Sequence, residues 1–287
     1  HSIDANGHVC HTRAFMRTTA PLSLMAVLAI LSAAAALLGA ASPARADTIS
    51  TVCDEANLNA ALAAGGVITF DCNNVNDTAT IQFTGSKSVA VPTKVDGGGR
   101  ITLQGGNFNG SMIYVDPGAS LRVQAIALNG NTTTGLSGGA FYNNGTLELV
   151  QVDITGMNVG GANGGAIYSA GPLTLTRSAL IFNYAGYGGA IRAGAGSVHL
   201  ENSTIAFNYA SAASPLAGNG VYLDAGVPLT AVNATIAYNA YSVDGANIVV
   251  DGGALTLRNT LLQNSGYANI TRTTGSVTSL GYNLADD

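Results

Sequence analysis

The sequence predicts an all-β fold in which short strands wind into a parallel solenoid. Six similar triplets begin 26, 26, 25, 31 and 26 residues apart, at Leu121, Leu147, Leu173, Val198, Leu229 and Leu255. A period in the twenties indicates stacked supersecondary units. Apolar and polar residues alternate inside each unit, which is the pattern of a half-buried strand. Glycine pairs separate the units and leave no stretch with helical spacing between them.

A unit of this length cannot enclose a core alone. Stacked on its neighbours, it can pair each strand edge with the units above and below, at a spacing of roughly 4.8 Å. We therefore expect one inward apolar position on each rung, together with the repeated Leu-x-Leu positions. The residues assigned to this inward column are Ile126, Ile154, Leu180, Ile205, Ile236 and Leu261.

A short helix is predicted ahead of the repeats, over residues 54–63. Leu58 and Leu62 lie on one face, acidic residues occupy the first turn, and Gly65-Gly66 ends the segment. Cys53 and Cys72 flank this helix. If the chain is exported, a disulfide between them would hold the helix over the open end of the solenoid, and two buried free thiols are the alternative.

The repeats also resemble a known family. Residues 164–208, GGAIYSAGPLTLTRSALIFNYAGYGGAIRAGAGSVHLENSTIAFN, are similar to right-handed parallel β-helix repeats of the pectin-lyase-like superfamily. The similarity is strongest to GGAI-repeat surface proteins related to polymorphic outer-membrane proteins, and it covers roughly residues 52–284. The segment VCDEANLNAALAAGGVITFDC resembles the capping segment of secreted bacterial members. This resemblance implies a right-handed β-helix, a fold that hosts lyases, hydrolases and adhesins alike.

The beginning of the chain has the features of an export signal. Met16-Arg17 precede an uncharged run from Leu22 to Ala41, and Ala44-Arg45-Ala46 supplies a small-x-small cleavage pattern. We interpret residues 16–46 as a signal peptide, residues 1–15 as a non-native upstream segment and residues 47–287 as the β-helix domain. An uncleaved membrane anchor is the alternative for the apolar run. The sequence after the last rung indicates truncation at the carboxyl end.

Charge and composition limit the partners. Charged residues make up 9% of the chain, and the net charge is −5. Removing residues 1–46 takes away three arginines and one aspartate, which moves the net charge to −7. Because no basic stripe is present to neutralise phosphates, we do not expect nucleic-acid binding. We expect a monomer without cofactor or metal and, once the signal is removed, without a transmembrane span.

Asparagines recur at two positions of the repeat. One set is expected to share a first corner, and the other set to share a second: Asn202, Asn233 and Asn259; and Asn183, Asn208, Asn239 and Asn264. Asparagine tolerates tight turns, and stacked amides can bond along a ladder. We therefore interpret both sets as structural.

One aromatic column is the strongest candidate for a ligand site. Tyr142, Tyr168, Arg192 and Tyr222 fall at the same position of successive units, beside residues expected to point inward. Outward tyrosines about 5 Å apart offer apolar faces and hydroxyl groups to sugar rings. The alternative is a ladder that only stiffens the surface. A second aromatic set, Phe182, Phe207 and Tyr238, precedes the corner asparagines, and we interpret it as corner packing.

No catalytic constellation emerges from the acidic residues or from His199. Glycosidases need two neighbouring carboxyl groups, and lyases of this fold need clustered acids with a basic proton acceptor. Glu148, Asp153 and Glu201 each stand alone in the alignment. Asp224 and Asp251 occupy Gly-containing turns on consecutive rungs, where backbone capping is the expected role and a weak cation site the alternative.

The sequence therefore predicts a secreted or surface-displayed β-helix scaffold, adhesin-like, that binds a polysaccharide or cell-surface glycan. A polysaccharide lyase or glycoside hydrolase of the pectin-lyase-like superfamily is the alternative. We lean against catalysis because the repeated positions hold polar columns instead of a cluster of acids and bases.

Overall fold

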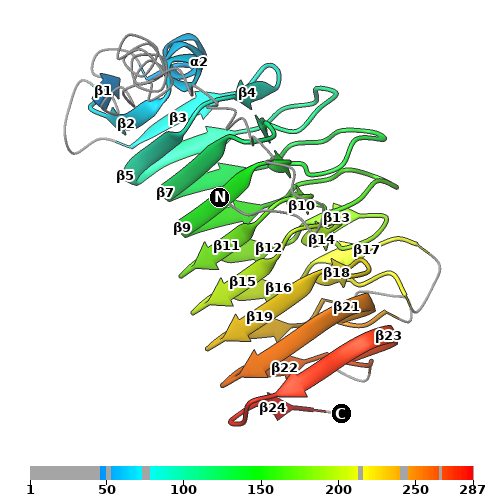
Figure 1. Ribbon diagram of the computed structural model, residues 1–287. Helices are drawn as coiled ribbons and strands as arrows, with labels where there is room; N and C mark the ends of the chain where they lie inside the picture. The colour runs from blue at the N-terminus through cyan, green and yellow to red at the C-terminus, as the bar shows by residue number, and fades with distance from the viewer. Residues whose placement is uncertain are drawn as a thin grey trace, which may run out of the picture. The chain divides into compact units, whose positions relative to one another are not determined.

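A computed structural model describes residues 46–49, 53–72, 78–212, 216–239, 245–264 and 267–286 of the chain. Within these residues the protein is a parallel β-solenoid of about eight turns with one short helix (Figure 1). The fold class predicted from the repeats is thus confirmed. The segment 1–15 and the signal peptide, except for the backbone of Ala46, lie outside the described residues.

The strands stack in three columns that run along the solenoid. The first column presents three-residue strands that pair in parallel from rung to rung: β4 (Lys87–Val89), β6 (Ile113–Val115), β8 (Phe141–Asn143), β10 (Ile167–Ser169), β14 (Ile191–Ala193) and β18 (Val221–Leu223). The beginnings of β21 (Ile248–Arg258) and β23 (Ile270–Ser279) continue it.

The second column follows the first around each turn. Its separate strands are β1 (Ala46–Ile49), β2 (Gly66–Phe70), β11 (Leu173–Thr176), β15 (Val198–Glu201) and β19 (Pro228–Val232). Three long strands bend from the second column into the third: β5 (Thr93–Gln104), β7 (Ser120–Asn129) and β9 (Thr146–Thr155). The ends of β21 and β23 complete the second column.

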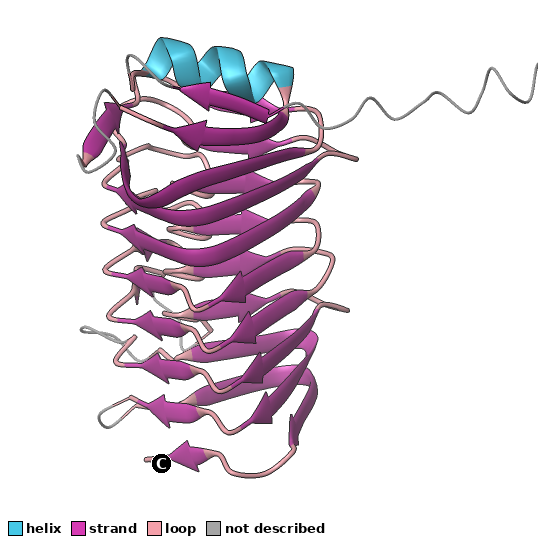
Figure 2. Cartoon of the chain, turned by 90° about the vertical axis from the view of Figure 1, so that its left-hand side faces the viewer, coloured by secondary structure: helices cyan, strands magenta, loops and turns pink. Residues whose placement is uncertain are grey.

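The third column closes the turn. Its separate strands are β3 (Ala79–Gln82), β12 (Ala179–Ile181), β16 (Thr204–Ala206), β20 (Thr235–Ala237), β22 (Leu261–Gln263) and β24 (Leu284–Ala285). A separate parallel pair, β13 (Tyr184–Ala185) with β17 (Tyr209–Ala210), lies just after it. Figure 2 shows the strands stacked one above another along the whole solenoid.

The core is the continuous interior of these turns. The Leu-x-Leu residues are buried as predicted, and Leu175 pairs with Leu149 and Leu200 on the adjoining rungs. The single inward column needs two corrections. Leu262, not Leu261, aligns with Ile236 and is buried. Leu128, not Ile126, aligns with Ile154, although both lie inside. In each case two nearby apolar residues fit the repeat equally well. Leu261 and Leu262 are consecutive, and Ile126 and Leu128 are two residues apart, so the sequence alignment could choose either member of each pair.

Helix α2 (Glu55–Ala64) covers the first rungs, as the cyan helix of Figure 2 shows. Asp54 caps it by accepting a hydrogen bond from the Asn57 N–H at 2.9 Å. Leu58 and Leu62 are buried against the core beneath. The structure joins Cys53 to Cys72 in a disulfide with their Cα atoms 5.5 Å apart, so the residue ahead of the helix is tied to the chain just after β2.

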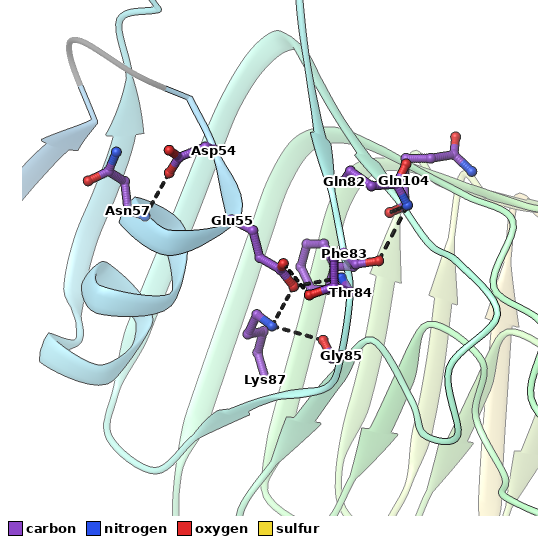
Figure 3. Close-up of polar contacts among 9 residues, drawn as sticks. All are labelled: Asp54, Glu55, Asn57, Gln82, Phe83, Thr84, Gly85, Lys87 and Gln104. Carbon is purple, nitrogen blue, oxygen red and sulfur yellow. Dashed lines mark hydrogen bonds and ion pairs between the residues drawn. The ribbon is translucent and has the colours of Figure 1, made fainter.

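A polar lock attaches the helix to the next turn (Figure 3). Glu55 accepts hydrogen bonds from the Thr84 N–H at 2.8 Å, from the Thr84 hydroxyl at 2.7 Å and from Lys87 Nζ at 2.6 Å. Burial works to raise the Glu55 pKa, but these hydrogen bonds and the Lys87 charge outweigh it and lower the pKa to about 2. Within the described residues, no helix has the length and apolar character needed to cross a bilayer.

A buried amide ladder runs along one corner of the solenoid. The side-chain amide of Asn183 donates to Asn208 Oδ1 at 2.9 Å, and Asn208 donates in the same way to Asn239 at 2.9 Å. The same acceptor oxygens also receive the backbone N–H of the preceding asparagine. This corner confirms the first three positions of the predicted set.

The ladder then departs from the sequence alignment. Asn239 donates to Asn247 at 2.8 Å, Asn247 to Asn269 at 2.8 Å, and Asn269 to Asp286 at 2.7 Å. The predicted next member, Asn264, bonds instead to the carbonyl oxygens of Gly245 and Ala268. Asn247 follows Asn239 by only eight residues, so a fixed repeat length does not find it.

Candidate functional site

The aromatic column predicted on the first strand column exists in the expected register. Tyr168 of β10 pairs with Tyr142 of β8 on one side and with Arg192 of β14 on the other. Arg192 pairs in turn with Tyr222 of β18. Tyr114 of β6 extends the column by one rung, and the sequence comparison missed it because no Gly-Gly-Ala precedes that strand.

The first three members form a ladder of half-buried tyrosines. The ring centroids of Tyr114 and Tyr142 are 5.6 Å apart, and those of Tyr142 and Tyr168 are 4.9 Å apart. Each pair is tilted by 34°. Burial raises the Tyr142 pKa, and the two flanking tyrosines raise it further. The phenol of Tyr142 therefore remains neutral at physiological pH, as a hydrogen-bonding group at the edge of an apolar ring.

Arg192 ends this ladder, and neighbouring residues fix its guanidinium from three sides. It forms a two-bond pair with Asp224, through Nε at 3.2 Å and Nη2 at 3.0 Å. Its Nη1 donates to Asn163 Oδ1 at 2.6 Å. The rings of Tyr187 and Tyr222 lie 5.5 and 4.9 Å from its central carbon. Such a bidentate pair fixes orientation as well as charge.

Tyr222 belongs to the column but is not open to a ligand. It is only 7% exposed, and it packs with Ala246, Val249 and Tyr187 in a small apolar cluster outside the main core. Its hydroxyl donates to Asp251 at 2.7 Å. Burial first, and then this bond and the Asp251 charge, raise the Tyr222 pKa to about 12. The alternation of apolar and polar residues along the strand correctly predicted that the Tyr222 side chain points away from the main core. It did not predict this second layer of packing.

The two turn acids take part in this arrangement. Sequence analysis assigned Asp224 and Asp251 to backbone capping, whereas their carboxylates bond side chains of the aromatic column. Asp251 also accepts a hydrogen bond from the Thr273 hydroxyl. Hydrogen bonds from Thr273 and Tyr222 lower the Asp251 pKa, and Arg192 adds to this effect. The Arg192–Asp224 pair spans 32 residues because it crosses the longest repeat. Aligning strand positions from rung to rung misses this pair, since Asp224 lies in the turn after β18.

The strand acids lie apart, as the alignment predicted. Glu148 forms an ion pair with Arg122 on the preceding rung, a partner that the alignment did not consider. Asp153 pairs in register with Ala179, and Glu201 with Thr176 and Val232. His199 stands between Thr174 and Thr230. In the part of the chain that the structure describes, no three His, Cys, Asp or Glu residues gather as metal ligands.

The second aromatic set lies at the corner after the third strand column. Phe182, Phe207 and Tyr238 stack with centroids 5.4 Å apart, which agrees with corner packing. They are nevertheless 62%, 49% and 38% exposed. All three adopt left-handed φ angles of 54–56°. Bulky residues are rare in this region, which glycine adopts without cost.

Glycine occupies the same corner on two earlier rungs. Gly130 and Gly156 have φ angles of 43° and 71°, and their N–H groups donate to the following rung as that of Phe207 does. The backbone thus requires a left-handed residue here, and the aromatic side chains are an addition to that requirement. The buried amides that follow directly, Asn183, Asn208 and Asn239, hold these positions in register.

Comparisons with known proteins identify no relative. No family model matches the chain, no curated protein is significantly similar to it, and no solved structure matches it.

Proposed function

We propose that this chain is an exported β-helix scaffold, adhesin-like, that binds glycans on its first strand column. The observation that carries the proposal is the ladder of Tyr114, Tyr142 and Tyr168, which leads to an arginine already fixed by Asp224 and Asn163. Half-buried tyrosines provide apolar ring surface together with hydroxyl groups, the combination that sugars require. The disulfide and the apolar run ahead of the domain support export. The resemblance to pectin-lyase-like repeats agrees with this proposal.

The rigidity of the ladder favours binding. Each tyrosine belongs to a strand paired on both sides, so its backbone is already ordered before a ligand arrives. A preorganised site loses little conformational entropy on binding. Contacts of this kind are individually weak, and useful retention follows from many copies displayed on one surface.

Binding is better supported than cleavage at this site. A lyase needs a basic group that is able to accept a proton, and Arg192 is held in a bidentate pair with Asp224. The carboxylates of Asp224 and Asp251 bond to Arg192 and Tyr222 respectively, which favours a positioning role for both.

The proposal is tested by glycan-array binding of the parent protein and of a Tyr142→Ala, Tyr168→Ala double variant. We expect the parent to retain at least one glycan, and the variant to lose about tenfold or more in affinity, because two stacking rings are gone. A matched control is Tyr184→Ala, Tyr209→Ala, which removes a tyrosine pair with a similar 5.2 Å spacing and the same 34° tilt from a different face. Equal loss in both variants, or no binding by the parent, would contradict the proposal.

A further inference from the structure

Gly194 follows β14 and lies against Tyr168 of the tyrosine ladder. Its backbone has no left-handed φ angle, so the conformation does not require glycine. A Cβ atom there would lie 2.7 Å from the Tyr168 hydroxyl oxygen and 3.4 Å from Asp224 Oδ2. The absence of a side chain at Gly194 therefore lets a phenol and a carboxylate converge there, and any side chain would clash with the phenol.

The charges around these two groups do not favour an acidic ligand. Arg192 is the cation of the cluster, and both oxygens of Asp224 accept its hydrogen bonds. Asp251 adds a second carboxylate, and the groups that donate to it, the hydroxyls of Tyr222 and Thr273, are neutral. One positive and two negative charges leave this cluster with an excess negative charge.

We infer that the Tyr168 hydroxyl and the Asp224 carboxylate, which converge over Gly194, form a subsite for a hydroxyl group of an uncharged sugar, and that this subsite discriminates against uronic acids. The inference rests on the proposed glycan-binding function and specifies its ligand class. Asp224 can accept a hydrogen bond from a sugar hydroxyl while it keeps its two bonds to Arg192, because each carboxylate oxygen has a second lone pair. The Tyr168 hydroxyl can donate to the same sugar or accept from it.

A uronate would meet the opposite situation. Its carboxylate would approach Asp224 and Asp251 in a partly desolvated site, where like charges repel more strongly than in water. It could gain Arg192 as a partner only by competing with Asp224, which already occupies the guanidinium in a bidentate geometry. Specificity of this kind arises from a repulsive element as well as from an attractive one.

The test uses one polymer in two charge states, polygalacturonate and its fully methyl-esterified form, at low ionic strength. For the parent protein we expect retention of the esterified polymer to exceed that of the free acid by about tenfold. Asp224→Asn keeps an oxygen facing Arg192 but removes the negative charge that balances the arginine. In this variant the ratio of esterified to free-acid retention should fall to about one or reverse. Asp153→Asn makes the same charge change on the third strand column and should leave the ratio unchanged.

A second variant tests the close approach of Tyr168 and Asp224 over Gly194. Gly194→Ala should lower retention of the esterified polymer by about tenfold, because the methyl group displaces the Tyr168 hydroxyl. Gly161→Ala is the control, since a Cβ there meets nothing within 4 Å. Circular dichroism confirms that each variant is folded.

The outcomes separate this inference from the function on which it rests. If the parent retains both charge states equally, or neither, while Tyr142→Ala, Tyr168→Ala still abolishes binding on the array, glycan binding stands and the charge selection is wrong. If the parent retains no glycan at all, the proposed function fails and this inference fails with it. An Asp224→Asn ratio equal to that of the parent would also contradict the role given to Asp224.

Discussion

The asparagine ladder and the tyrosine ladder repeat once per rung, yet they occupy opposite environments. The amides of Asn183, Asn208 and Asn239 are buried, and the oxygens of Asn208 and Asn239 each accept both a backbone and a side-chain N–H from the preceding asparagine. The rings of Tyr114, Tyr142 and Tyr168 are half-buried, and neighbouring rings lie next to each other at a tilt of 34°. Repetition alone therefore does not distinguish a structural column from a binding one.

What distinguishes them is the cost of removing one member. A buried amide that disappears leaves donors and acceptors without partners in a dry environment, and each such group costs about 1–3 kcal/mol. An outer tyrosine that disappears exposes its neighbours to water, which replaces the lost contacts. The first ladder should dominate stability, and the second should be free to serve binding.

The largest expected effect tests which side of a strand faces the core. Leu175→Asp places a carboxylate among the fully buried residues of the second strand column and should reduce the free energy of unfolding by more than about 4 kcal/mol. Thr174→Asp, one residue earlier and directed outward, should cost less than about 1 kcal/mol. Chemical denaturation of both variants measures the difference. Equal destabilisation would mean that the register derived from the repeats is wrong.

The next effect tests the amide ladder directly. Asn208→Ala removes the acceptor of two Asn183 donors and the donor to the Leu180 carbonyl, so we expect a loss of about 2–3 kcal/mol. Asn202→Ala makes the same chemical change on the same turn at an exposed corner, and should cost about 1 kcal/mol or less.

Tyr142→Ala completes the comparison, with an expected loss of about 1 kcal/mol from its two ring contacts. Urea denaturation ranks the three variants. If Tyr142→Ala were as harmful as Asn208→Ala, the outer ladder would be a structural column, and the glycan proposal would lose its physical basis.

Much of this arrangement could be predicted from the sequence, because residues that lie one repeat apart in a solenoid are stacked at the same position of neighbouring turns. The Leu-x-Leu triplets located the second strand column, and the spacing of Tyr142, Tyr168 and Arg192 placed them side by side. Glu55 could be assigned to the first helical turn, but its partners could not, since Thr84 and Lys87 lie outside the repeats.

The sequence predictions fail where the spacing of the residues departs from the regular repeat length. Asn247, not Asn264, follows Asn239 in the ladder, and Asp224 reaches Arg192 across the longest repeat. Burial of Tyr222 by Ala246 and Val249 was also hidden, because alternation predicts the direction of a side chain but not what covers it. The exposure of Phe182 was hidden for the same reason, because its alignment with Phe207 does not show how much of the ring is covered.

The amino-terminal lock is an intermediate case between the two ladders, because it is polar and only partly buried. The pKa of Glu55 is lowered from 4.5 to about 2, so the folded state favours the ionised carboxylate. A lowered folded-state pKa stabilises the protein above the unfolded pKa, and this contribution is lost as pH falls toward the folded value. Acidification from about pH 5 to about pH 2 should therefore loosen α2 from the first rungs.

Hydrogen exchange across this pH range measures the effect in residues 54–72, after correction for the intrinsic pH dependence of exchange. We expect protection there to fall in the parent, with the later rungs less affected. Glu55→Gln keeps the shape of the side chain but removes its charge, and should cost about 1 kcal/mol at neutral pH, confined to the amino-terminal cap. Because a glutamine side chain does not ionise, the variant should show a weaker pH dependence than the parent. Identical pH profiles for parent and variant would mean that another acid, and not Glu55, controls the attachment of the cap.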